Sequence, residues 1–177
     1  MKIGAFEIQE PVPDLRNTRA IAMLRPWIDV GRVGTLVLGQ LERKMGASEL
    51  GKLARPGTFF DFTRYRPRIR MIEGERVFST PNSIVNYAKD SHTERDYLFL
   101  HLREPHAFGE DYAEAIVELA EHFNVTEYCR IGGMYDSVPH TREPRITFTA
   151  TGKKNNSLLK KIETKQIENV CYRNSRG

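Results

Sequence analysis

Two polar loops hold most of the side chains in this sequence that could transfer a proton or bind an anion. Each loop follows a short run of β-forming residues, 97–102 and 127–131. The side chains are Glu104, His106, Tyr135, Asp136, His140 and Arg142. In open α/β sheets, ligands bind beyond the carboxyl ends of the strands, so parallel strands would bring both loops to one edge of the sheet.

An enzymatic site can be assembled from these residues. Glu104 or Asp136 would orient a histidine, and His106 or His140 would then act as the general base. Arg142 would hold a carboxylate or phosphate with its guanidinium fork. In the structural alternative, Asp136 and His140 only tie their loop to itself, and Arg142 pairs with Glu104. The sequence leaves both interpretations open.

A third loop, Gly31-Arg32-Val33-Gly34, leads into a predicted helix, so its backbone N–H groups could bind an anion together with Tyr135 and Arg142. The same glycines would also serve a tight turn that packs against the sheet. The loop has neither the dinucleotide fingerprint nor the Gly-Lys-Ser/Thr ending of a P-loop. The histidines and cysteines show no metal-ligand spacing. We therefore expect neither a cofactor nor a metal.

The charge distribution argues against a nucleic-acid partner. The chain has a net charge of +4, but residues 150–177 contain seven of its 27 basic residues and only two of its 23 acidic ones. The remaining 20 basic and 21 acidic side chains leave the body nearly neutral. No apolar run approaches the roughly 20 residues that a membrane span requires. Two cysteines suit a reducing cytoplasm, with Cys129 as a buried free thiol.

The hydrophobic pattern predicts alternating strands and helices within one domain, residues 1–151, followed by a basic polar tail, 152–177, that is partly helical or disordered. Val33, Val37, Leu41 and Met45 recur every four residues and predict a helix that ends at Gly46. A second helix is predicted over 113–123 and a short one over 48–53. Strands are predicted at 20–30, with Pro26 indicating an edge or irregular stretch, and at 58–62, 84–87, 97–102, 127–131 and 145–150, with a hairpin at 68–72 and 76–78.

Four motifs together resemble the bacterial and archaeal branch of the proteasome assembly chaperone family, of the second chaperone type. They are RPWIDVGRVGT, LARPGTFFDFTRYRP, FLHLREPHAFGEDY and GGMYDSVPHTR, and the resemblance spans roughly residues 20–150. It implies a three-layer α/β/α fold with a mixed sheet, like that of purine nucleoside phosphorylases and related hydrolases. It also implies a homo-oligomer, with a trimer favoured, and a protein partner related to the proteasome.

The chain departs from this family at its end. The hydrophobic-Tyr-any-residue tail of some archaeal relatives is absent, and the region after Thr149 turns lysine-rich instead of continuing through further strands. We therefore expect a sheet that is incomplete at its C-terminus and leaves apolar surface uncovered. Bacterial members also carry the label of predicted ATP-grasp or carboxylate–amine ligases. The alternative function is therefore a small-molecule-binding enzyme, either such an ATP-dependent ligase or a phosphorylase- or hydrolase-like enzyme, that uses the polar loops at the strand ends. No nucleotide-binding lysine or paired metal-binding carboxylates stand out, so we favour a non-catalytic interaction protein.

Overall fold

The computed structural model describes residues 1–137, 139, 141–142 and 146–151. The chain divides into two compact units, Met1–Met134 and Tyr135–Gly177. The first unit contains the strands β1 (Lys2–Ile3), β2 (Phe6–Ile8), β3 (Arg19–Arg25), β4 (Ser48–Leu53), β5 (Arg68–Ile72), β6 (Glu75–Ser79), β7 (Ile84–Ala88), β8 (Tyr97–Arg103) and β9 (Glu127–Arg130), and the helices α1 (Val33–Met45) and α2 (Gly109–His122).

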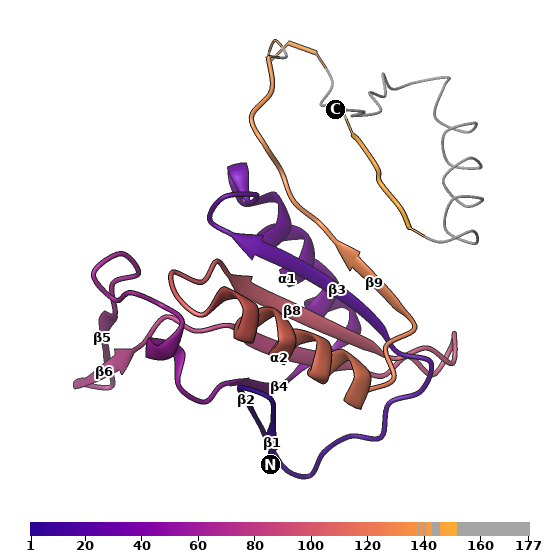
Figure 1. The fold of residues 1–177 in the computed structure, drawn as a ribbon, viewed down its shortest axis with the longest axis horizontal. Helices are drawn as coiled ribbons and strands as arrows, with labels where there is room; N and C mark the ends of the chain where they lie inside the picture. The colour runs from indigo at the N-terminus through magenta and orange to yellow at the C-terminus, as the bar shows by residue number, and fades with distance from the viewer. Residues whose placement is uncertain (138, 140, 143–145, 152–177) are drawn as a thin grey trace. The chain divides into compact units, whose positions relative to one another are not determined.

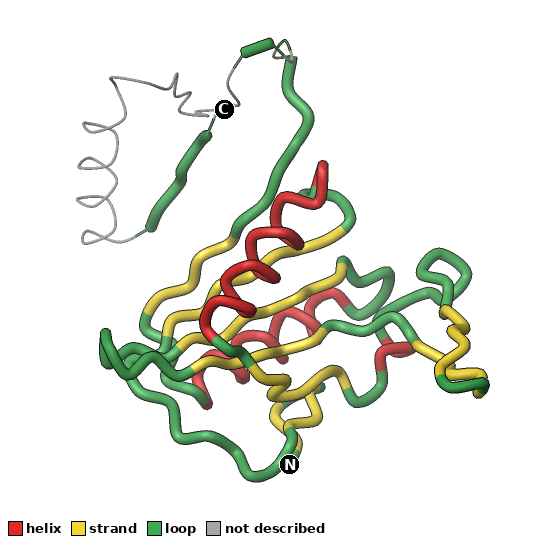
Figure 2. The backbone as a smooth tube through the Cα atoms, turned by 180° about the vertical axis from the view of Figure 1, so that it is seen from behind, coloured by secondary structure: helices red, strands yellow, loops and turns green. Residues whose placement is uncertain are grey.

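Seven of these strands form one mixed sheet in the order β1-β2-β4-β7-β8-β3-β9. β3 lies between β8 and β9 and runs parallel to both, whereas β7 and β8 are antiparallel. α2 covers one face of the sheet in Figure 1, and Figure 2 shows α1 on the opposite face. The predicted three-layer α/β/α fold with a mixed sheet is therefore confirmed.

The alternation of side chains along β3 supplies both faces of this core. Ala20 and Ala22 are buried in the cluster that α2 joins through Tyr112, Ala115 and Leu119. Met23 lies in the other cluster, with Phe99 of β8 and Leu38 of α1. Because successive side chains of a strand point to opposite faces, a strand covered by a helix on each side reads as an almost continuous apolar run.

The two long helices follow their predicted patterns. α1 ends at Met45 and is capped by Gly46 at φ +63°, a conformation that glycine adopts without strain. α2 begins at Gly109, a few residues before its predicted start, and has Glu110 and Asp111 in its first turn, where acidic side chains suit the helix dipole. The predicted hairpin is confirmed as β5 and β6, and the strand at 84–87 as β7.

A polar network joins α1 to the middle of the sheet. The Glu42 carboxylate accepts a hydrogen bond from the Asn86 amide at 2.7 Å, and its Oε1 lies 2.6 Å from His101 Nε2. The side chains of Glu42 and His101 are only 14% and 16% exposed. His101 is thus the hydrogen-bonded core histidine that its position in a buried strand predicts.

The helix predicted over 48–53 is wrong, because this segment is β4. It pairs antiparallel with β2 and β7, and Leu50, Gly51 and Leu53 are buried. A Cβ atom on Gly51 would lie 2.4 Å from the carbonyl oxygen of Glu7. Six residues give too short a pattern to separate a helix from a strand, so strand pairing with distant segments decides the outcome.

The strand predicted over 58–62 is also wrong. Pro56–Thr58 forms a 3₁₀ turn, and the backbone N–H groups of Phe59 and Phe60 bond to the carbonyl of Pro56. The two aromatic rings pack against Tyr112 of α2, with ring centroids 5.2 and 6.0 Å apart. The β-forming composition here reflects the packing of side chains in the core rather than strand pairing.

Three further expectations need correction. β3 ends before Pro26 and lies in the interior of the sheet, not at its edge. Cys129 is exposed, because it lies on β9, the last strand of the sheet. Residues 146–150 form no strand; Arg145 and the predicted tail, 152–177, lie outside the described residues.

Within the described part of the chain, no helix has the length and apolar composition needed to cross a membrane.

Replacement of Glu42 by alanine should destabilise the protein by about 1–3 kcal/mol, because Asn86 and His101 would lose a shared partner in a largely buried position. Glu42→Gln keeps an oxygen acceptor and should therefore lose less stability than Glu42→Ala. Arg43→Ala changes the neighbouring exposed residue and serves as the control. Urea unfolding measures all three variants, and a wild-type midpoint for Glu42→Ala would contradict the assignment.

Two glycines of α1 provide a matched pair for a second test. A Cβ atom on Gly34 would lie 2.9 Å from Met23 Cβ and 3.1 Å from the backbone oxygen of Ile131, whereas the nearest atom at Gly39 is Arg43 Nη1 at 3.9 Å. Gly34→Ala should therefore cost about 1–3 kcal/mol through overpacking. Gly39→Ala should stabilise by about 0.5–1 kcal/mol. Thermal unfolding separates them, and equal effects would disprove the close packing of α1.

Candidate functional site

The parallel strands β3 and β8 bring two chain segments together at their carboxyl ends. The register places Arg25 opposite Arg103, and the backbone N–H of Glu104 donates to the carbonyl of Arg25 at 3.0 Å. The loop after β9 begins at the same edge, because Gly133 pairs with Asp29 in an isolated parallel bridge. The sequence argument for a shared edge thus holds for the beginning of each loop.

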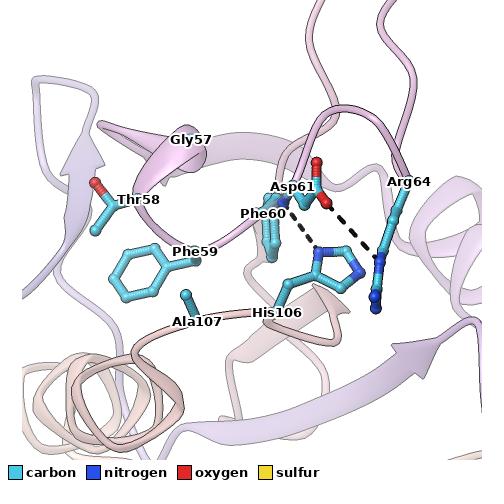
Figure 3. Close-up of a pocket in the computed structure, with 8 residues that line it drawn as sticks. All are labelled: Gly57, Thr58, Phe59, Phe60, Asp61, Arg64, His106 and Ala107. Carbon is cyan, nitrogen blue, oxygen red and sulfur yellow. Dashed lines mark hydrogen bonds and ion pairs between the residues drawn. The ribbon is translucent and has the colours of Figure 1, made fainter.

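His106 lies in a hollow of about 340 Å³ formed by loop 57–64 and the turn after β8. Figure 3 shows its ring beneath Asp61, with Nδ1 directed at the Asp61 backbone nitrogen, 3.0 Å away. The backbone N–H of His106 donates to the carbonyl of Phe59 at 2.8 Å. The ring also packs on Tyr65, with centroids 4.5 Å apart. The turn after β8 is thus fastened to a loop far away in the sequence.

The hydrogen bond to His106 restricts the chemistry that this ring can perform. A backbone N–H can only donate, so Nδ1 must be the acceptor, and the neutral ring carries its proton on Nε2. A general base acting through Nε2 needs the opposite tautomer, usually held by a carboxylate at Nδ1–H. His106 would have to give up its bond to Asp61 to adopt that form. The arrangement suits a donor that binds an acceptor group.

Asp61 supports the loop rather than the histidine. Its Oδ1 accepts hydrogen bonds from the backbone N–H and the hydroxyl of Thr63 at 2.8 and 2.7 Å. These two bonds hold the pKa of Asp61 below its ordinary value. Arg64 Nε lies 3.8 Å from Oδ2 of the same carboxylate and forms an ion pair with it.

Arg25 and Arg103 are polar features of this edge that the sequence analysis did not single out. Burial is the main cause that lowers the pKa of both groups. Asp29 opposes the lowering at Arg25, and Arg25 itself contributes to it at Arg103. The sequence signals them only weakly. Each arginine follows an apolar run, Arg25 just before Pro26 and Arg103 just before Glu104-Pro105.

The loop from Asp29 to Gly34 closes on itself. The Asp29 carboxylate accepts hydrogen bonds from the backbone N–H and the hydroxyl of Thr35 at 3.1 and 2.5 Å. Thr35 lies in the first turn of α1, so Asp29 ties the preceding loop to the start of this helix. Gly31 has a φ of +64°, and Gly34 packs on Met23. This geometry is that of a tight turn packed on the sheet, and the ligand-binding role of the two glycines stays a prediction.

The remaining predicted site residues belong to the second compact unit. Tyr135 is 89% exposed, Asp136 accepts a hydrogen bond from the backbone N–H of Ser137 at 2.7 Å, and the backbone N–H of Arg142 donates to the carbonyl of Pro139. His140 lies outside the described residues. The structure thus places the backbone of Glu104 beside Arg25 and holds His106 against loop 57–64, and the functional roles of all the predicted site residues stay predictions.

Solved structures share this fold. A PAC2 family protein from Streptomyces avermitilis superimposes with a TM-score of 0.73 at 18% identity, covering 90% of this chain and 66% of its own. A proteasome-assembly chaperone homologue from Mycobacterium tuberculosis gives 0.65 at 19% identity, covering 70% and 52%. A protein of unknown function from Corynebacterium glutamicum gives 0.68 at 20% identity, covering 95% and 70%.

The present chain thus spans less than two thirds of the length of the first two structures. No curated protein matches its sequence significantly. Residues 23–170, most of the chain, match the model of the PAC2 family. The four motifs identified in the sequence lie within this range, and the sheet topology is shared with a solved member of the family. The chain belongs to the PAC2 family.

Proposed function

We propose that this protein is a non-catalytic, homo-oligomeric interaction protein, and that the hairpin β5–β6 of one copy binds the outer surface of α2 in the next. The observation that carries this proposal is a projecting hairpin whose large apolar side chains are uncovered. The side chains are Ile69, Met71, Ile72, Val77 and Phe78, and each is 42–66% exposed.

The register of the hairpin gathers three of these side chains on one face. Ile69 stands opposite Phe78, and Met71 stands opposite Arg76, so these four share a face and Val77 points to the other. In the described part of the chain, β5 and β6 pair only with each other. A two-stranded hairpin is at best marginally stable in water, and a partner that covers the apolar face would stabilise it.

An apolar groove with an acidic rim lies at the C-terminal end of α2. It has a volume of about 580 Å³ and is lined mainly by Ile116, Val117, Ala120, Val125 and Tyr128, with Glu121 beside them. The outer surface of α2 also carries the exposed acids Glu110, Asp111, Glu114 and Glu118. The groove therefore complements a hairpin face that presents three apolar side chains and Arg76.

The positions of hairpin and groove favour a contact between copies. In Figure 1 the hairpin projects at the left of the first unit, whereas the end of α2 that carries the groove lies at the right. A contact between two different surfaces repeats head to tail and closes into a ring when the rotation allows. A trimer, the assembly implied by the family resemblance, would be such a ring.

The geometry of His106 supports a non-catalytic role. Its Nδ1 accepts a hydrogen bond from the backbone of Asp61 instead of donating one to a carboxylate. The ring of His101 does contact a carboxylate, but it does so in the network with Glu42 on α1. Binding rather than proton transfer is the chemistry that this edge offers.

We also propose a protein partner related to the proteasome, in the cytoplasm. This extends to the present chain what the Mycobacterium tuberculosis homologue is called, and the shared fold is compatible with it. Gel filtration of the chain with purified proteasome α-subunits tests the idea directly. Co-elution in a defined ratio would support it, and separate elution at concentrations where the α-subunits remain soluble would contradict it.

Phe78→Glu should dissociate the oligomer, because it places a charge in the centre of the apolar hairpin face. Val77→Glu is the matched control, since Val77 is the adjacent residue, is also exposed, and points to the opposite face. Multi-angle light scattering measures the mass of each variant, and circular dichroism checks the fold. A monomeric wild-type chain, or equal dissociation by the two variants, would contradict the proposed contact.

Charge reversal tests which surface receives the hairpin. Arg76→Glu and Glu121→Arg should each weaken association, and the double variant should recover part of the loss, because the pair is restored with its charges exchanged. Glu75→Arg on the opposite face provides the control for the change in net charge. Additive losses in the double variant would show that Arg76 and Glu121 do not face each other.

A further inference from the structure

Two half-buried arginines without an ionic partner lie side by side at the carboxyl end of the central strands. Arg25 and Arg103 are register partners on β3 and β8, and adjacent strands are about 4.8 Å apart. Each is the last residue of its strand. Within the described chain, neither guanidinium group belongs to an ion pair. Two like charges in this position call for a counter-charge.

Part of their hydrogen-bonding capacity is also unused. The Nε atom of Arg25 is buried and has no hydrogen-bond partner among the described residues. Arg103 uses its Nε to donate to the carbonyl of Asn82 at 3.1 Å, and its guanidinium carbon lies 5.2 Å from the centre of the Tyr65 ring. Tyr65 is itself held by a hydrogen bond from its hydroxyl to the Glu104 carbonyl. Arg103 is therefore positioned, while Arg25 retains a donor that points at no acceptor.

The surrounding charges make the site a cationic one. Arg32 and Arg68 lie close enough to lower the pKa of Arg25, which is lowered chiefly by burial. The Asp29 carboxylate opposes this effect and raises the pKa of Arg25, but it already accepts two hydrogen bonds from Thr35. Burial, and after it the charge of Glu104, raises the pKa of Tyr65. The charges that act on Arg25 and Arg103 thus include more guanidinium groups than carboxylates.

We propose that Arg25 and Arg103 bind the doubly charged phosphate group of a small molecule, either inorganic phosphate or a phosphate monoester. Guanidinium forks match the spacing of phosphate oxygens and bind them bidentately. The local excess of guanidinium groups favours an anionic ligand. Neither Arg25 nor Arg103 belongs to the hairpin or the groove, although Arg68 at the start of β5 lies near both arginines. The site can therefore be tested apart from the proposed oligomer contact.

Calorimetric titration of the full chain with inorganic phosphate, and separately with a nucleoside monophosphate, tests the site. Arg25→Gln and Arg103→Gln should each weaken binding by about 10- to 100-fold, the usual loss for a hydrogen bond to a charged group. Lysine at either position keeps the charge but not the fork and should retain part of the affinity. Arg43→Gln, on the exposed side of α1, should bind as the wild type does. Tighter binding of the nucleotide would identify a monoester as the ligand, and equal affinities would identify the free ion.

A second measurement locates the ligand independently of folding effects. The NMR signals of the Arg25 and Arg103 Nε–H groups, assigned through the lysine variants, should shift on addition of phosphate and not of chloride at equal ionic strength. The midpoint temperature of thermal unfolding should rise by roughly 5 °C when the phosphate concentration is about 100 times the dissociation constant. Failure of phosphate to move either Nε signal, or an equal loss of affinity in Arg43→Gln, would overturn the proposal.

Discussion

The parallel pairing of β3 with β8 is the constraint on which the rest of the structure depends. Seven register pairs join the two strands, and their side chains fill both faces of the sheet. Each face needs its own helix, because the apolar side chains on both faces would otherwise be exposed to water. α1 and α2 provide that cover, and Gly34 lets α1 approach Met23 closely enough to do so.

The same pairing explains why charged groups meet at one edge. Both strands end on an arginine, and parallel strands in register place these ends together. The edge is then closed by segments from elsewhere in the chain. Loop 57–64 fastens the turn at His106, and Asp29 fastens the start of α1. Charge is thereby concentrated at a place where the backbone is held by several independent hydrogen bonds.

Apolar surface remains on the outside of this body, on the hairpin β5–β6 and along α2. Neither surface is needed to cover the central sheet, so both are available for contacts with other chains. The phosphate site that we propose would lie on the packed part, and the oligomer contact on the exterior.

The sequence alone determined the elements with long or strongly periodic patterns: α1, α2, the buried strand β8 and the hairpin β5–β6. It also pointed to the loops that follow β8 and β9, and its four motifs led to the family. These features are local, because a repeat of four residues or an unbroken apolar run limits which element can form.

Only the tertiary structure decided the short and ambiguous segments. Residues 48–53 became a strand through pairing with β2 and β7, and the aromatic run at 58–62 became a turn because its rings pack on Tyr112. It also decided that His106 Nδ1 accepts a hydrogen bond from a backbone amide and that Arg25 meets Arg103. Such outcomes depend on residues that are distant in the chain, and no local pattern records which partner a side chain will find.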